Sequence, residues 1–137
     1  MSANLDLVRS IYADWERGDF THGEWADPQI EYVVADGPEP GSWVGKAEMA
    51  QHARPRLSVW ESLRYEAGEY RELDDGRVLV LSRLKGRGKG SGVEVDQRRA
   101  SCFHVEEGKV IRIVIYWDRY RALADLGLAP EADSPGA

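Results

Sequence analysis

An apolar strand in the stretch YVVADGPEPGSWVG, residues 32–45, ends at Asp36, and Pro38 and Pro40 stiffen the loop that follows. A carboxylate held in a rigid loop is suited either to proton transfer or to an ion pair with a buried cation. Arg99 is the cation that we expect across the fold from it. Two alternatives stay open: a structural Asp36–Arg99 ion pair, or an Asp36 base whose pKa is set by burial and by Arg99.

The three histidines differ in where their segments place them. His52 lies three residues after Met49 in a helical pattern that turns it inward, which makes it the second candidate for a base. His22 lies in a polar loop, and His104 falls on an outer strand face, where a role in a dimer interface is favoured. No group of His, Asp and Glu has the sequence spacing of metal ligands, and no phosphate-binding glycine loop or nucleophile elbow occurs. We therefore expect no metal site and no cofactor.

The elements that must position these side chains follow from the period of the apolar residues. Steps of three and four predict an amphipathic helix over residues 5–15 and a second helix over residues 46–60. Pro55 lies inside the second helix and is expected to kink or divide it. Between the helices, residues 20–26 favour a short helical turn and residues 30–34 a strand.

From residue 63 onward the period changes to two, which indicates strands joined by short turns in an antiparallel meander. The predicted strands cover residues 63–73, 77–85, 93–105 and 109–117. A last helix is expected over residues 119–128, within a single domain over residues 1–129 that a flexible tail, residues 130–137, follows. The fold class is α+β, with helices against one face of a curved sheet that forms a cone around a cavity.

Strand alternation sorts the side chains of this sheet into two faces. The inner face is expected to hold Val78, Val80, Ser82 and Leu84, then Val95, Gln97, Arg99, Ser101 and Phe103, then Ile111, Ile113, Ile115 and Trp117. The outer face is also partly apolar, although helices are available to cover only one face. We therefore expect a homodimer that packs through the outer sheet faces.

The charge balance limits the partners. The chain has a net charge of −6 and a pI near 5.1, which disfavours nucleic acid and anionic membranes because both attract a basic surface. Cys102 is the only cysteine, so no intrachain disulfide forms. The N-terminal segment MSANLDLVRS lacks the apolar core of a signal peptide, and a cytoplasmic location is expected.

Three stretches together resemble a known family: GDF after the first helix, GSWVG before the second, and EEGKVIRIVIYWDRYRALADLGL at the end. The chain resembles the SnoaL-like branch of the nuclear transport factor 2-like superfamily, which includes ketosteroid isomerases, polyketide cyclases and limonene epoxide hydrolases. The resemblance covers residues 5–128. It implies a pocket between the helices and the concave sheet face, and dimerisation through the outer face.

The resemblance also implies roles for single residues. The base of the ketosteroid isomerases falls at Asp36 in one register of the first strand and at Tyr32 in another. The isomerase tyrosine falls at Ile11, one residue before Tyr12, and the acid that isomerases and cyclases use on a central strand is replaced by Ser101. The Asp-Arg-Asp constellation of the epoxide hydrolases has no counterpart at the matching positions, which are Ser82, Leu84 and Ile115.

The expected function is proton transfer by an isomerase, cyclase or hydratase that acts on an apolar polycyclic or terpenoid-like substrate. Asp36, Arg99 and His52 are the catalytic candidates. The expected substrate-binding residues are Tyr12, Trp15, Tyr32, Trp43, Trp60, Ser82, Gln97, Ser101, Phe103, Ile113, Ile115 and Trp117. The alternative is a module on the same fold that binds a hydrophobic small molecule or a partner without catalysis.

Overall fold

A computed structural model describes residues 2–73 and 76–130 of the chain. The elements within these ranges are α1 (Ala3–Glu16), β1 (Ala26–Val34), β2 (Gly41–Val44), α2 (Lys46–Ser58), β3 (Trp60–Glu72), β4 (Arg77–Gly88), β5 (Glu94–Glu106), β6 (Lys109–Tyr116) and α3 (Arg119–Asp125). Apart from Pro130, the predicted tail lies outside the described residues, as does most of the turn between β3 and β4.

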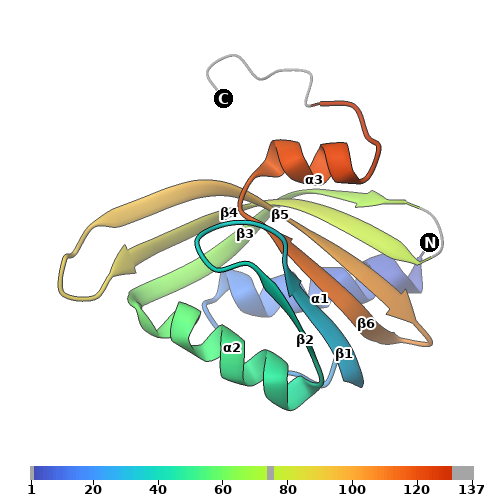
Figure 1. The fold of residues 1–137 in the computed structure, drawn as a ribbon, viewed down its shortest axis with the longest axis horizontal. Helices are drawn as coiled ribbons and strands as arrows, with labels where there is room; N and C mark the ends of the chain where they lie inside the picture. Colours follow the sequence, from blue (N-terminus) through green and yellow to red (C-terminus); the bar gives the residue numbers. More distant parts are fainter. Residues whose placement is uncertain (1, 74–75, 131–137) are drawn as a thin grey trace.

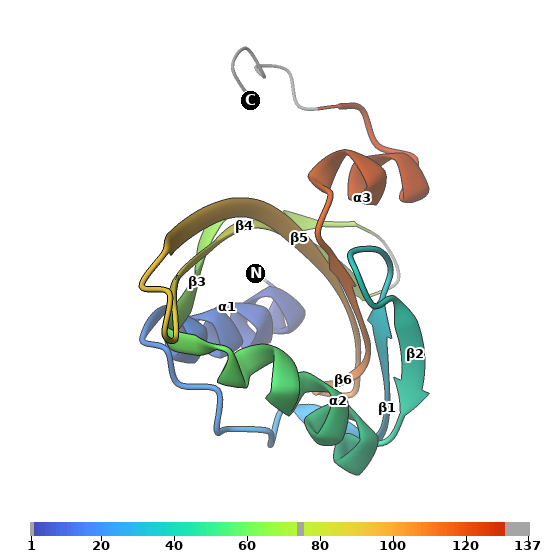
Figure 2. The same cartoon turned by 60° about the vertical axis from the view of Figure 1, so that its left-hand side comes forward.

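The strands form one sheet in the order β2-β1-β6-β5-β4-β3. Strands β3 to β6 pair antiparallel, which confirms the predicted meander, whereas β1 runs parallel to β6. The sheet bends around α1, and α2 lies along the open side of the concave face (Figure 1, Figure 2). The α+β architecture predicted from the sequence is therefore confirmed.

The two long helices contribute differently to the core. Helix α1 is capped by the Ser2 hydroxyl and buries Val8, Ile11 and Tyr12 against the concave face. No residue of α2 is buried, so this helix covers the cone rather than filling it. Pro55 lies inside α2, which continues through it, so the helix is not divided. The proline removes one N–H near an exposed helix end, where water can satisfy the carbonyl that loses its partner.

Two segments between the helices differ from the sequence prediction. Residues 20–26 form no helix, and β1 already begins at Ala26. Residues 41–44, which we expected to be loop, form the edge strand β2 and pair antiparallel with β1. The pairing runs from Glu31 opposite Val44 to Val34 opposite Gly41. A strand of this length between glycines carries too few residues for its period to be recognised.

An irregular register changes the inner face of β6. The pairing of β5 with β6 shifts between His104 and Val105, so one extra residue stands on β6. As a result Val110, rather than the predicted Ile111, joins Ile113 in the core of the concave face. Beyond the shift, the predicted alternation holds.

The outer face of the sheet is covered by a helix of the same chain. Helix α3 lies on the convex side (Figure 2) and packs Ala122 and Leu123 against it. The strand residues buried in this second core are Leu79, Leu81, Ala100, Cys102, Val114 and Tyr116. The expectation of a bare apolar outer face is therefore wrong. The closing helix, although predicted, was not expected to turn back over this side.

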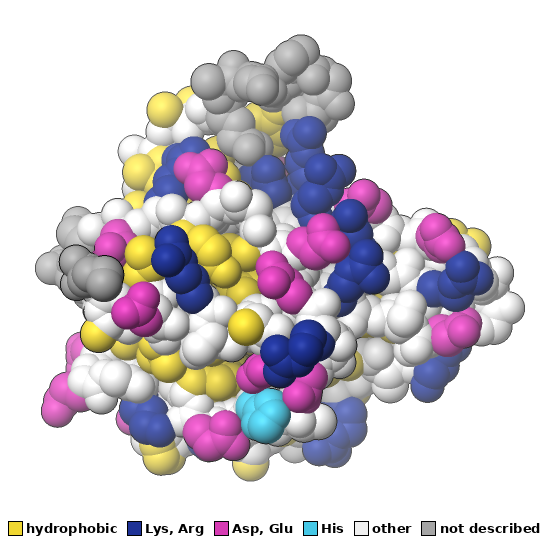
Figure 3. All heavy atoms as spheres, turned by 180° about the vertical axis from the view of Figure 1, so that it is seen from behind, with side chains coloured by type: hydrophobic (Ala, Val, Ile, Leu, Met, Phe, Trp, Pro, Cys, Tyr) yellow, Lys and Arg dark blue, Asp and Glu magenta, His cyan; other side chains and the backbone are white. Residues whose placement is uncertain are grey.

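Charged side chains are interspersed on the surface seen from behind the view of Figure 1. Basic and acidic groups alternate there around a small apolar area (Figure 3). Several of them pair across strands, as Arg83 does with Asp96 at 3.0 Å and Lys85 with Glu66 at 3.1 Å. None of the helices in the described ranges is long and apolar enough to cross a bilayer.

Candidate functional site

The pairing of the central strands brings the predicted polar side chains together on the concave face. Ser82 on β4 lies opposite Arg99 on β5. Two residues further along β5, Ser101 lies opposite Val80 on one side and Ile115 on the other. Ser82, Arg99 and Ser101 are all buried. Three polar side chains therefore stand side by side in a layer that is otherwise apolar.

Aromatic side chains fill the concave face next to this layer. The ring centroid of Tyr12 lies 5.0 Å from that of Trp15 and 5.9 Å from that of Phe103. Trp15 also contacts Trp25 and Tyr65, at 6.1 and 5.6 Å. Of the predicted substrate-binding residues, this core contains Tyr12, Tyr32, Phe103 and Ile113, with Trp15, Trp43 and Ile115 packed against it. These side chains form the walls of any site on the concave face.

Among the residues that the structure describes, three buried polar atoms of this region have no hydrogen-bond partner: Tyr12 Oη, Ser82 Oγ and Arg99 Nε. Burial raises the pKa of the Tyr12 phenol well above its usual value, and the neighbouring Ser101 and Ser82 hydroxyls offset part of this rise. The two serine hydroxyls therefore lie close to Tyr12 Oη, although no hydrogen bond of normal geometry joins them. Buried polar groups in folded proteins are almost always paired, so this cluster is unusual.

Arg99 is a nearly completely buried cation, with 5% of its surface exposed. Its Nη2 donates to Gln97 Oε1 at 2.6 Å, and its guanidinium lies 3.9 Å from the ring centroid of Trp117. Burial lowers the pKa of Arg99, while interactions with Tyr65 and with the Asp36 carboxylate act in the opposite direction. Across residues 2–73 and 76–130, no ion pair joins Arg99 to Asp36 or to another carboxylate, so the predicted Asp36–Arg99 pair does not form.

Asp36 instead holds the turn between β6 and α3. Its Oδ1 accepts a hydrogen bond from Trp117 N at 2.6 Å, and its Oδ2 accepts one from Asp118 N at 3.0 Å. Both oxygens of this carboxylate are thus occupied by main-chain donors, and the side chain caps the turn. Gly37 follows with φ +91°, and a Cβ there would lie 2.9 Å from the Trp117 ring. This loop therefore positions Trp117, which in turn contacts Arg99.

His52 belongs to a separate stack between α2 and β2. Its ring lies parallel to Trp43 with centroids 4.2 Å apart, and its Nε2 is 3.6 Å from Glu48 Oε1. Trp43 also contacts Tyr32, whose pKa burial raises to about 12, and Arg56 approaches the Trp43 ring to 5.6 Å. The structure thus brings His52, Trp43 and Tyr32 together, in a group distinct from the polar layer.

A groove of about 1060 Å³ opens beside the first residues of β5. Its apolar lining includes Trp60, Leu63 and Val95, with charged side chains of both signs around it. Gly86 on β4 makes room for the predicted Trp60, because a Cβ there would lie 2.8 Å from the Trp60 ring. Val95 and Arg99 are four residues apart on the same strand face, about 13 Å along β5. Arg99, Ser82 and Tyr12 are not among the residues that line this groove.

Sequence reasoning missed two contributors to this region. Tyr65 stands on the concave side near Arg99, and burial raises its pKa. The sequence pattern does not reveal its inward position, because the pairing of β3 with β4 shifts between Ala67 and Glu69 and obscures the alternation of β3. Gly86 follows the strand predicted over residues 77–85, whereas the structure places it inside β4, where it makes room for the Trp60 ring.

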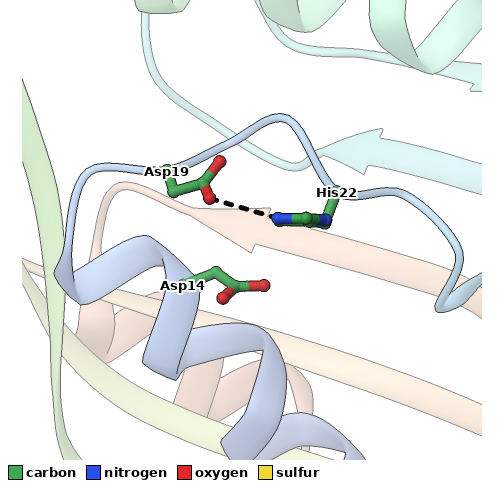
Figure 4. A group of neighbouring side chains, drawn as sticks. All are labelled: Asp14, Asp19 and His22. Atoms are coloured by element: carbon green, nitrogen blue, oxygen red, sulfur yellow. Dashed lines mark ion pairs between the residues drawn. The ribbon is translucent and has the colours of Figure 1, made fainter.

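Asp14, Asp19 and His22 meet at the end of α1, where one ligand atom of each lies within 4.8 Å of the others (Figure 4). The sequence analysis found no such cluster, because the chain folds back after α1 to bring these side chains together. His22 Nε2 lies 3.2 Å from Asp19 Oδ2, and Asp14 forms an ion pair with Arg17. All three side chains are partly exposed and already have partners, which is typical of a surface ion-pair network.

The family model of the SnoaL-like domain matches residues 8–113. A search of curated proteins finds no significant match. Among solved structures, the chain is similar to an NTF2-like protein of unknown function from Burkholderia pseudomallei, with a TM-score of 0.74, 19% identity, and coverage of 90% of this chain and 97% of that one.

Two further similar structures contain small molecules. TerC co-crystallised with polyporic acid matches with a TM-score of 0.71 and 21% identity, over 93% of this chain and 98% of that one. A protein with a ketosteroid isomerase-like fold from Catenulispora acidiphila, in complex with trimethylamine, matches with a TM-score of 0.67 and 15% identity, over 95% and 98%. At these identities the likeness shows the fold alone.

Proposed function

Because the chain belongs to the SnoaL-like domain family of the NTF2-like superfamily, we propose that it binds an apolar small molecule on the concave face of its sheet and catalyses proton transfer on it. The reaction class is that of an isomerase, cyclase or hydratase. The observation that carries the proposal is the cluster of buried polar atoms without partners, Tyr12 Oη, Ser82 Oγ and Arg99 Nε. A ligand oxygen placed among them would satisfy groups that are costly to leave unpaired.

The proposed chemistry is polarisation of a substrate carbonyl. Because burial raises the pKa of Tyr12, its phenol keeps its proton at neutral pH and can donate a hydrogen bond. When a neighbouring carbon loses a proton, negative charge develops on the carbonyl oxygen, and donors fixed in an apolar surrounding stabilise that charge. Ser82 would assist as a second hydroxyl donor.

Two residues are candidates for the base of this reaction. Asp36 is the first, although its bonds to Trp117 N and Asp118 N favour a positioning role. His52 is the second, since imidazole exchanges protons near neutral pH. Turnover by Asp36→Asn with loss in His52→Gln would assign the base to His52, and the reverse pattern would assign it to Asp36.

An aromatic-rich concave face fits a flat polycyclic or terpenoid-like ligand. Trp15, Tyr65 and Phe103 supply apolar ring surface beside the polar layer. That two proteins of the same fold hold polyporic acid and trimethylamine supports a small molecule as the ligand. Gln97, Ser101 and Trp117 are proposed as further contacts at its polar end.

The test is calorimetric titration with polycyclic ketones and the corresponding hydrocarbons. We expect a ketone to bind more tightly than its hydrocarbon, and Tyr12→Phe to remove most of the difference. Ser10→Ala is the matched control, because Ser10 is an exposed position of the same helix whose hydroxyl bonds only within α1. Equal binding of ketone and hydrocarbon, or no binding of either, would refute the proposal.

The alternative function is binding without catalysis. The occupied oxygens of Asp36 favour it, because the position that the resemblance gives to the base acts here as a main-chain cap. Incubation of any ligand found by titration, followed by mass spectrometry and by deuterium exchange from solvent, distinguishes the two. Deuterium uptake that requires Tyr12 supports catalysis, and an unchanged ligand supports a binding module.

A homodimer is part of the proposal. Helix α3 covers the outer face through which we expected the dimer to pack. Tyr120 on this helix is 52% exposed and would be a contact if α3 itself forms the interface. Sedimentation at micromolar concentration of wild type and of Tyr120→Glu tests this: a monomer in both would refute the dimer.

A further inference from the structure

The unpaired guanidinium of Arg99 carries information about the charge of the ligand. We infer that the small molecule bound on the concave face carries an anionic oxygen group, a carboxylate or an ionised enol, which pairs with Arg99. This inference rests on the proposed function, because it assumes that the concave face binds a small molecule. It goes further, since polarising a neutral carbonyl would not require a buried cation.

The first step is the missing counter-charge. Among the described residues, Arg99 makes no ion pair, and one of its five N–H groups donates to a side chain, the neutral Gln97 at 2.6 Å. Other arginines of the sheet contrast with it. The Arg83 side chain is 49% exposed and pairs with Asp96, and that of Arg87 is 46% exposed and pairs with Glu94. The most deeply buried of these cations is thus the one without an ion pair, and Asp36 acts on it only from beyond ion-pair distance.

The second step is that Arg99 is held in place rather than free to reach solvent. Trp117 lies against the guanidinium, and Asp36 fixes the backbone of Trp117. Arg119 donates from Nη2 to the carbonyl of Ser82 at 2.6 Å and from Nε to that of Arg99 at 3.3 Å, which ties the two facing strand positions together. A guanidinium that stacks on an aromatic ring keeps the N–H groups of its edge available for an acceptor in its plane.

The third step is the character of the surrounding groups, each of which can donate a hydrogen bond. Arg99 Nε, Ser82 Oγ and Tyr12 Oη are buried, lack partners and belong to neighbouring positions of the concave face. A carboxylate or enolate accepts several hydrogen bonds and donates none, so it matches this set better than an alcohol or an amine does. Its charge would also offset the cost of the buried cation.

The test uses two pairs of compounds that differ in charge but share a ring. The first pair is naphthoate and the methyl naphthyl ketone of the same ring position. The second is a hydroxynaphthoquinone, which is ionised at neutral pH, and its neutral methyl ether. Calorimetric titration of the whole chain should show the anion binding roughly 10- to 100-fold more tightly than its neutral partner in at least one pair, the range for a hydrogen bond to a charged group. The pair that shows the preference distinguishes a carboxylate from an enol.

The variants are Arg99→Gln, Arg99→Lys and Arg83→Gln. Arg99→Gln should abolish the preference for the anion, and Arg99→Lys should keep a smaller one because it retains the charge without the planar edge. Arg83→Gln removes the same charge from the position of β4 next to Ser82 and should leave the preference for the anion unchanged. Thermal unfolding of each variant identifies any that is unfolded.

The outcomes separate this inference from the function on which it rests. If the neutral compounds bind as tightly as the anions to the wild type, the inference is overturned and the proposed function stands. If Arg99→Gln folds and keeps the anion preference, the inference is likewise overturned. Binding of none of the four compounds would count against both. The wild-type comparison decides the matter even if Arg99→Gln does not fold.

Discussion

Replacing Asp36 should lower stability, because its carboxylate accepts the two main-chain hydrogen bonds that fix the turn between β6 and α3. Hydrogen bonds to a charged group contribute about 1.5–3 kcal/mol each, and the exposure of this site places them at the lower end of that range. Asp36→Ala loses both, so we expect a loss of about 3 kcal/mol in the free energy of unfolding. Asp36→Asn keeps one neutral acceptor oxygen, and about half of that loss is expected.

These free energies convert into melting temperatures through the entropy of unfolding. For a chain of 137 residues that entropy is about 0.3 kcal/mol/K near the melting temperature. The expected decreases are therefore about 10 °C for Asp36→Ala and about 5 °C for Asp36→Asn. Circular dichroism during heating measures both, and urea titration gives the free energies directly.

The control is Glu39→Ala in the same loop. Its side chain is exposed and makes no hydrogen bond or ion pair within the described ranges, while the charge change is identical. We expect a shift of less than about 2 °C. If both Asp36 variants melt at the same temperature as the wild type, the hydrogen bonds of Asp36 do not contribute to stability, and the prediction is wrong. If they also lose all turnover, Asp36 is the base after all.

Four further substitutions test other parts of the structure. Tyr12→Phe removes a buried hydroxyl without a partner, so urea unfolding should show an unchanged or slightly higher stability, up to about 1 kcal/mol, and a loss would show that the hydroxyl is paired. Phe103→Ala deletes a fully buried ring and should cost about 3–5 kcal/mol by the same assay; a cost below about 1 kcal/mol would contradict its place in the core. Gly86→Ala should displace the Trp60 ring and shift its fluorescence, and an unchanged spectrum would contradict the close approach. Burial raises the pKa of the Cys102 thiol from 9.0 to about 11, so its contribution to the free energy of unfolding is complete below pH 9 and is lost as the pH rises toward 11. Cys102→Ala should therefore lose less stability at alkaline pH than the wild type does. Identical pH profiles of the two proteins would refute this expectation.

The sequence predicted the parts of the fold that have a local period. The alternation of residues 78–84 and 95–103 correctly placed Ser82, Arg99 and Ser101 on one face, because a strand face is fixed by parity alone. The helical period of residues 5–15 likewise found α1 and its buried Tyr12. Both features can be predicted from the pattern of residues that are close together in the chain.

The rest depends on contacts that no local pattern encodes. The packing of α3 on the convex side reflects which face remained uncovered after α1 had docked, not the sequence of α3 itself. The bonds of Asp36 join residues more than eighty positions apart, so the choice between an ion pair with Arg99 and a main-chain cap could not be made from the sequence. The same holds for the unpaired state of Arg99, which appears only when its surroundings are known.

The parallel pairing of β1 with β6 sets an order for folding. Strands β3 to β6 are joined by short turns and can pair as successive hairpins. Strand β1, in contrast, pairs with a strand that follows it by about eighty residues. On the ribosome, α1, β1 and β2 emerge first but lack their sheet partner until β6 has been synthesised. The N-terminal third of the chain would therefore wait, with its apolar side chains exposed, and a pause in translation before β6 should favour aggregation over folding.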